Sequence, residues 1–137
     1  MKKVTGIGGI FFKCKEPDKM RDWYRDQLGL VTNEYGSLFE FRKADADEPA
    51  YLQWSTMSEG SDHFKPSEKE FMINYRVHDL EALKKELEKS DVKIVSDIES
   101  FEYGKFMHIM DPEGNKIELW EPIDEPFTNL YKGQTTK

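Results

Sequence analysis

The sequence contains one cysteine, Cys14, in 137 residues. A single cysteine excludes an internal disulfide and a zinc site built from clustered cysteines. Long apolar runs are absent too, since none approaches the roughly 20 residues that a membrane-spanning helix needs. The N-terminal residues do not lead into the apolar stretch and small-residue cleavage site of a signal peptide. We therefore expect a cytoplasmic protein that makes no membrane contact.

Positive charge is also in short supply. Lys and Arg number 20 against 27 Asp and Glu, which gives a formal net charge of −7. Nucleic-acid binding normally requires a basic face for the phosphates, so this balance argues against a nucleic-acid partner. Aromatic residues, by contrast, make up 13% of the chain. Because each large ring buries much area, a chain of about one domain's length is expected to form a folded core.

The first half of the chain has the pattern of a strand, a helix and three further strands. Apolar residues over 5–14 predict the strand, Pro17 suits the first turn of the helix, and Gly29 is typical of the residue just past a helix end. The three further strands are predicted at 30–34, 38–43 and 50–55.

The same order returns in the second half. A strand is predicted over 70–77, and Asp79 is a suitable cap for the helix that follows. Pro and Gly within 111–115 favour a tight turn, so the last two strands form a hairpin. The strands after the helix are predicted at 92–97, 104–110 and 116–121.

This internal repeat predicts an α+β fold made of two βαβββ modules. Positions such as Ile10 and Ile73, or Gln53 and Glu118, correspond between the halves. The expected organisation is a first module over 1–58, a linker over 59–68, a second module over 69–122 and a polar, mobile tail over 123–137.

Side chains alternate between the two faces of a strand, so each strand presents a helix-covered face and an opposite face. If Met110 pairs with Lys116 across the hairpin turn, His108 lies opposite Glu118 on that second face. The residues expected on it are Phe11, Lys13, Tyr51, Gln53, Asn74, Arg76, His108, Glu118 and Trp120. Large rings around a few polar groups are typical of a small-molecule pocket.

Glu118 and His108 are the candidate acid–base groups of this face. Glu118 acts either as a general base or metal ligand, or as a structural partner of Lys13 or Arg76. His108 acts either in proton transfer or ligation, or as a strand histidine bonded to a neighbour. We read two other histidines, His63 and His78, as surface residues.

The cations and rings of the face also have two interpretations. Arg76, helped by Lys13 and Asn74, either clamps an anionic ligand such as a carboxylate or pairs within the protein, with Glu118 or Glu40. Aromatic clusters are more often core than ligand platforms. Phe11 and Trp120 are the stronger candidates for stacking on a ligand.

Two segments carry a family resemblance. Gly6 to Phe12, followed by Asp22 to Leu30, resembles the opening of the vicinal oxygen chelate superfamily, and Asp111 to Pro122 resembles its closing hairpin. This superfamily includes glyoxalase I, bleomycin-resistance proteins and extradiol dioxygenases, and the resemblance covers roughly residues 4–122. It implies that the two modules form a curved mixed sheet around a cup, and that the protein is a homodimer.

The resemblance also implies four matched positions for metal ligands. In glyoxalase I-like members these are His, Glu or Gln, His and Glu. Here they correspond to Gly9, Gln53, Met72 and Glu118. Gly9 has no ligating side chain, and the Met72 thioether does not suit Zn, Ni or Mg. We therefore expect no metal cofactor, while a divalent metal held by Glu118, His108 and Gln53 is the alternative.

The sequence thus predicts a glyoxalase-like protein that binds a small aromatic or anionic organic molecule in its cup. Such a protein either only binds its ligand, as bleomycin-resistance-like members do, or transfers protons with Glu118 as the catalytic base and Arg76 stabilising an enolate-like charge. The alternative is a metal-dependent glyoxalase I-like lyase or isomerase, or a dioxygenase, with altered ligands. Fold alone does not decide between them.

Overall fold

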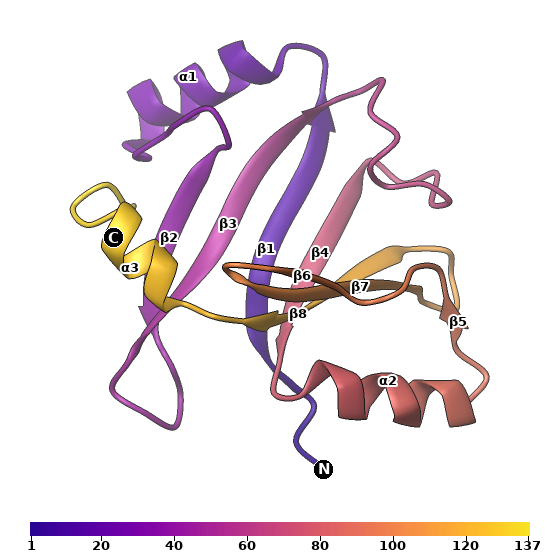
Figure 1. The fold of residues 1–137 in the computed structure, drawn as a ribbon. Helices are drawn as coiled ribbons and strands as arrows, with labels where there is room; N and C mark the ends of the chain where they lie inside the picture. Colours follow the sequence, from indigo (N-terminus) through magenta and orange to yellow (C-terminus); the bar gives the residue numbers. More distant parts are fainter.

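The computed structural model of the chain describes residues 1–137 and shows one eight-stranded mixed sheet with three helices. In chain order the elements are β1 (Val4–Cys14), α1 (Pro17–Leu28), β2 (Ser37–Arg42), β3 (Pro49–Ser58), β4 (Phe71–Val77), α2 (Leu80–Lys89), β5 (Lys93–Ile94), β6 (Glu99–Phe101), β7 (Gly104–Met110), β8 (Lys116–Pro122) and α3 (Glu125–Leu130). The strand order is β2-β3-β1-β4-β8-β7-β5, with β6 paired to β7. The sheet is curved: β6, β7 and β8 lie in front of β1, β3 and β4 in Figure 1. The predicted α+β fold class is confirmed.

The two long helices begin and end at the predicted signals. Gly29 follows α1 with a φ of 74°, which glycine adopts without strain, and its N–H donates to the Arg25 carbonyl. Before α2, the Asp79 side chain accepts the Ala82 N–H at 3.0 Å, as an N-cap does. None of the helices combines the length and apolar character needed to cross a membrane.

The strands differ from the prediction mainly beside the sheet edges. The strand predicted at 30–34 is absent, and only a single bridge joins Asn33 to Gly36. The predicted strand has no free edge to pair with, because the C-terminal residues occupy the open side of the edge strand β2 through the bridge from Phe39 to Thr136. The strand predicted at 92–97 shrinks to β5, and the short β6 was not predicted.

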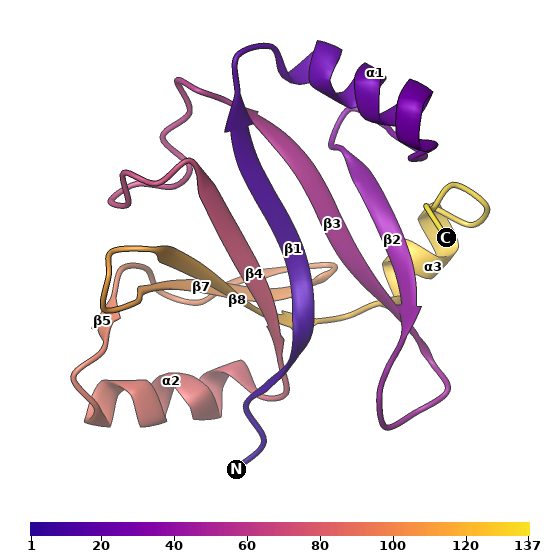
Figure 2. The ribbon, with the colours of Figure 1, turned by 180° about the vertical axis from the view of Figure 1, so that it is seen from behind.

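The predicted division of faces is confirmed. Phe12 and Trp54 pack beneath α1 against Tyr24, with ring centroids 5.6 Å apart for Phe12–Trp54 and 4.7 Å for Tyr24–Trp54. The core beneath α2 consists of Val77, Leu80, Leu83, Met107, Ile109 and Leu119. We call the opposite side the concave face; it carries Tyr51, Gln53, Asn74, Arg76, His108, Glu118 and Trp120. Seen from behind, α1 and α2 flank the other side of the sheet (Figure 2).

Strand β1 is irregular at its two central glycines. Its pairing with β4 shifts register between Ile7 and Gly9, which leaves Gly8 without a partner. A Cβ on Gly8 would lie 2.3 Å from Asn74 Oδ1 and 2.7 Å from Trp120 Cε3. Glycine is needed here because the concave-face side chains lie directly against the backbone.

The same strand separates from β3 toward its N-terminal end. The β1–β3 ladder begins at the pair Gly9–Gln53, whereas β1 stays paired with β4 as far as Val4–Val77. The first halves of β1 and β3 are therefore not bonded to each other. This split opens a space between neighbouring strands of the sheet.

The segment after β8 folds back over the concave face. The structure corrects the expectation of a mobile tail over 123–137, because this segment forms α3 and pairs with β2. The Asp124 carboxylate bonds Arg76, and the Phe127 ring lies 5.7 Å from Tyr51 and 5.9 Å from Trp120. Contacts from a distant part of the chain order the segment, and its own composition does not reveal them.

Candidate active site on the concave face

A continuous chain of hydrogen bonds links β4, β8 and β7 on the concave face. The register sets Asn74 beside Glu118 and Glu118 opposite His108, as predicted for the hairpin. Asn74 Nδ2 donates to Glu118 Oε1 at 2.8 Å, and His108 Nε2 lies 2.8 Å from Glu118 Oε2. Asn74 is only 2% exposed, but the Glu118 and His108 side chains retain 10% and 16% exposure. A molecule on the concave face can therefore touch Glu118 and His108 while Asn74 holds the carboxylate from behind.

The other nitrogen of His108 is held by Ser96, a residue that the sequence did not single out. Ser96 Oγ accepts the His108 backbone N–H at 2.8 Å and lies 3.1 Å from His108 Nδ1. An ionised carboxylate only accepts hydrogen bonds, so His108 Nε2 donates its hydrogen to Glu118. The Ser96 hydroxyl donates to Nδ1 of a neutral ring and accepts from Nδ1 of an imidazolium. Ser96 and Glu118 together set the orientation of the ring.

The electrostatics of the chain favour an ionised Glu118. Burial by itself raises the pKa of a carboxyl group, but the hydrogen bonds from His108 and Asn74 and the charge of His108 outweigh burial here. The pKa of Glu118 therefore lies below its ordinary value. At neutral pH Glu118 accepts protons and does not donate them.

The predicted linker contributes a second histidine to this site. Phe64 is fully buried against Phe11 and Met72, and it fixes the neighbouring His63 at the edge of the concave face. The His63 ring lies 6.5 Å from the ring of His108, and Lys116 Nζ donates to the His63 carbonyl at 2.9 Å.

Burial lowers the pKa of His63, opposed by Glu118 and supported by Lys116 and His108. His63 is exposed, as predicted, but the prediction did not place it beside the site. A phenylalanine in a polar segment was the available signal, because one buried ring can dock a loop.

The residues that could hold a divalent metal form a single row across the sheet. The row runs Gln53, Gly9, Asn74, Glu118 and His108 on neighbouring strands. Gln53 Nε2 carries two hydrogens and has three acceptors in reach: the Tyr35 carbonyl at 3.1 Å, the Trp54 carbonyl at 3.2 Å and Ser55 Oγ at 3.1 Å. Both Glu118 oxygens and His108 Nε2 are bonded to each other or to Asn74.

The remaining candidate donors do not change this result. Asn74 Oδ1 has no partner, but it is packed against Gly8. No three His, Cys, Asp or Glu side chains converge in the geometry of a metal site. The residues as arranged do not fit a divalent ion, which normally needs about three protein ligands.

The row also revises one correspondence between the halves. The resemblance matched Gly9 to Met72, but the register sets Asn74 beside both Gly9 and Glu118. Met72 pairs with Phe11 and is fully buried in the apolar cluster beneath Phe64. The parallel ladders set this correspondence, because β1 pairs with β3 at Gly9–Gln53 and β4 pairs with β8 at Asn74–Glu118. Gly9 therefore matches Asn74, two residues beyond Met72.

Arg76 pairs within the chain, but with a partner that the sequence did not suggest. Its Nη1 and Nη2 donate to the two carboxylate oxygens of Asp124, and Nη1 also donates to the Tyr51 carbonyl at 3.0 Å. The guanidinium lies 5.2 Å from the centre of the Trp120 ring. Neither Glu118 nor Glu40 pairs with it.

The other predicted ligand-binding side chains are packed against the protein itself. Phe11 is 8% exposed in the cluster with Phe64, and Trp120 is 4% exposed and stacked on Phe106. The Tyr51 hydroxyl lies 2.7 Å from Thr128 Oγ1. The Lys13 ammonium lies over the ring of Phe64 at 5.7 Å from its centre.

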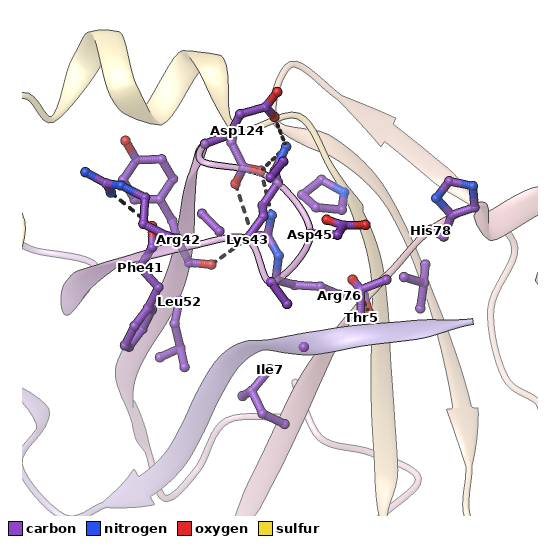
Figure 3. Close-up of a pocket in the computed structure, with 18 of the residues that line it drawn as sticks. Thr5, Ile7, Phe41, Arg42, Lys43, Asp45, Leu52, Arg76, His78 and Asp124 are labelled. Carbon is purple, nitrogen blue, oxygen red and sulfur yellow. Dashed lines mark hydrogen bonds and ion pairs between the residues drawn. The ribbon is translucent and has the colours of Figure 1, made fainter. Parts of the chain in front are cut away.

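A large cavity lies away from His108 and Glu118. It has a volume of about 780 Å³ and occupies the split between β1 and β3, under the loop over 43–48 (Figure 3). Tyr51 and Arg76 are the two predicted ligand-binding residues that line it. The structure thus divides the predicted cup into a hydrogen-bonded row and a separate cavity.

Comparison with known proteins supports the resemblance. The family model of the Glyoxalase/Bleomycin resistance protein/Dioxygenase superfamily matches residues 6–119, which confirms the predicted family. No curated protein matches the sequence. Methylmalonyl-CoA epimerase from Mycobacterium tuberculosis is 20% identical, with a TM-score of 0.56 over 91% of this chain and 93% of that chain.

Two further solved structures show the same similarity. A methylmalonyl-CoA epimerase variant from Streptomyces coelicolor, in complex with 2-nitronate-propionyl-CoA, is 17% identical, with a TM-score of 0.62 over 87% of this chain and 98% of that chain. A superfamily member from Vibrio splendidus 12B01 is 16% identical, with a TM-score of 0.55 over 84% and 97%. At these identities the similarity establishes the fold alone.

Proposed function

Because the chain belongs to the Glyoxalase/Bleomycin resistance protein/Dioxygenase superfamily, we propose that it binds a small aromatic or anionic organic molecule on its concave face and transfers a proton with Glu118 as the base. The observation that carries this proposal is the chain Asn74–Glu118–His108–Ser96. It leaves one carboxylate and one imidazole partly exposed in an otherwise packed face.

The chemistry follows from how Glu118 is held. Each carboxylate oxygen accepts one N–H and keeps a further lone pair for a ligand proton. His108 and Asn74 orient the carboxylate before a ligand arrives, which lowers the cost of reaching a productive geometry. Proton removal from a carbon beside a carbonyl leaves the electron pair on the ligand as an enolate. Glu118 becomes neutral in that step and returns the proton in the reverse one.

His63 is the second proton carrier in the proposal. A lowered pKa keeps its imidazole neutral at neutral pH, so it can both donate and accept a proton. It reaches the site from the segment between the two modules, whereas Glu118 belongs to the sheet. Methylmalonyl-CoA epimerases are among the proteins with similar folds, and their substrate is not transferred to this chain.

The experiment that tests the function is solvent exchange. The protein is incubated in D2O with simple carbonyl compounds that carry an acidic C–H, such as phenylpyruvate and acetoacetate, and loss of the C–H signal is followed by NMR. We expect Glu118→Gln to slow exchange by about 10²-fold or more, the usual contribution of a general base. Glu113→Gln, at an exposed turn residue, is the matched control.

Two results would contradict the proposal. Exchange at the wild-type rate in Glu118→Gln would show that Glu118 is not the base. No exchange with any compound would contradict the proposed proton transfer. Repeating the assay with Ni, Zn, Mn or Fe(II) separates the metal-dependent alternative, because rescue by a metal would show that the side chains rearrange to bind it. We also propose the homodimer that the resemblance implies, which light scattering tests directly.

A further inference from the structure

The cavity between β1 and β3 lies outside the hydrogen-bonded row. Residues Thr5 to Ile7 form one wall where β1 leaves β3, and Ala50 to Leu52 form the facing wall. The loop over 43–48 closes one side, and Arg76 and Asp124 also line the space (Figure 3). The space results from the split in the sheet.

Arg76 has an unused binding edge in this cavity. The guanidinium carries five N–H donors. Three of them are used, two by the Asp124 carboxylate and one by the Tyr51 carbonyl. The remaining Nε–H and second Nη2–H lie side by side on one edge, and no group of the chain accepts from them. Arg76 is only 7% exposed, so these donors are largely removed from bulk water.

Asp124 makes this edge specific. Its carboxylate holds the end of the guanidinium, and the Trp120 ring lies against the flat face at 5.2 Å, so the group cannot turn away. Two parallel N–H donors match the two oxygens of a carboxylate. A ligand carboxylate can therefore bind without displacing Asp124.

The surrounding charges select a single negative charge. Lys43 Nζ lies 2.8 Å from Glu48 and 3.9 Å from Asp124, and the Lys2 ammonium pairs with Asp45. The lining holds four cations and four carboxylates, so it has no excess positive charge to balance a dianion such as a phosphate monoester. One carboxylate needs only the free edge of Arg76, and Lys43 adds attraction to it.

The walls select an organic body. Ile7, Leu52, Val77 and Ala50 line the cavity, and Ile7 is 42% exposed. Burying such surfaces against an apolar group is favourable by about 25 cal/mol per Å². We propose that this cavity is a second binding site, which takes a monocarboxylate with an aliphatic or aromatic body on the free edge of Arg76.

The test uses phenylacetate and its neutral amide, phenylacetamide, as probes in amide NMR titrations of the ¹⁵N-labelled protein. Phenylacetate should shift the amides of residues 5–7 and 43–48 and not those of His108 and Glu118. Phenylacetamide should bind at least about tenfold more weakly, since it lacks the charge. Equal binding of the two probes, shifts centred on His108, or no shifts up to about 10 mM would overturn the proposal.

Two variants locate the binding edge. Arg76→Lys keeps the charge but loses the parallel donors, and we expect at least about tenfold weaker binding of phenylacetate. Because Arg76 is buried, that variant can also lose its fold. Ile7→Trp adds bulk to the apolar wall at a half-exposed position, where the organic body of the ligand is proposed to lie, and should weaken the binding of phenylacetate. Ile10→Trp is the matched control, because Ile10 is 41% exposed on the same strand and does not line the cavity. Wild-type affinity in Ile7→Trp would refute the site.

Discussion

The large buried side chain in the segment between the two modules is Phe64. Phe64 is fully buried against Phe11 and Met72, and the Lys13 ammonium covers its ring. Replacing a buried Phe with Ala removes its transfer free energy and leaves a cavity, which together cost about 3–5 kcal/mol. The segment is a loop that can partly collapse, so we expect about 3 kcal/mol for Phe64→Ala. That is a large fraction of the roughly 5–15 kcal/mol that holds a domain folded.

Urea denaturation at neutral pH measures this loss, read as a lower midpoint with an unchanged slope. Phe101→Ala is the control, because Phe101 is 48% exposed in the stack with Tyr103. We expect the control to lose less than about 1 kcal/mol. A loss for Phe64→Ala as small as that of the control would show that the segment does not dock. His63 would then have no fixed place beside His108.

Three further changes test the electrostatics and the packing of the concave face. The pKa of His63 is lowered in the folded protein, so the unfolded chain binds protons more readily and stability falls as pH drops below about 6.5. His63→Gln should make this fall shallower in urea titrations, and an unchanged slope would contradict the partial desolvation of the ring. The pH dependence from Glu118 has the opposite sign. Its stabilisation is present above an ordinary carboxyl pKa of about 4.3 and is lost as pH falls through its lowered pKa. The free energies of unfolding of wild type and Glu118→Gln should therefore converge in strong acid, and a constant difference would refute the lowered pKa. Gly8→Ala should cost about 1–3 kcal/mol of stability, because its Cβ would lie 2.3 Å from Asn74 Oδ1. Gly60→Ala is the control, because the nearest atom to a Cβ there is 3.9 Å away. Equal melting temperatures of the two variants would contradict the clash at Gly8.

Local patterns in the sequence were enough for the two long helices, for the long strands and for one pair of site residues. Gly29 and Asp79 end and begin their helices as predicted, because caps depend on the residue itself. His108 and Glu118 face each other because a short hairpin turn sets the register of both strands. The alternation of side chains likewise separated the helix-covered face from the concave face.

Other parts of the site follow from contacts between distant segments. Asp124 reaches Arg76 and His63 reaches His108 although neither pair shares a strand, a helix or a hairpin. Strand pairing sets Asn74, and not Met72, in the row with Gly9 and Glu118. Periodic patterns in the sequence do not predict contacts of this kind between distant segments.

The sequence by itself therefore determined the family, the two-module α+β architecture, the faces of the strands and the pairing of His108 with Glu118. The tertiary structure alone decided that the loop and the C-terminal segment fold over the concave face, and that β1 and β3 separate to form the cavity beside Arg76. The physical reason is range. Strand alternation, caps and hairpin register act over a few residues, whereas a loop settles where its few buried side chains, such as Phe64 and Phe127, find complementary surfaces elsewhere in the fold.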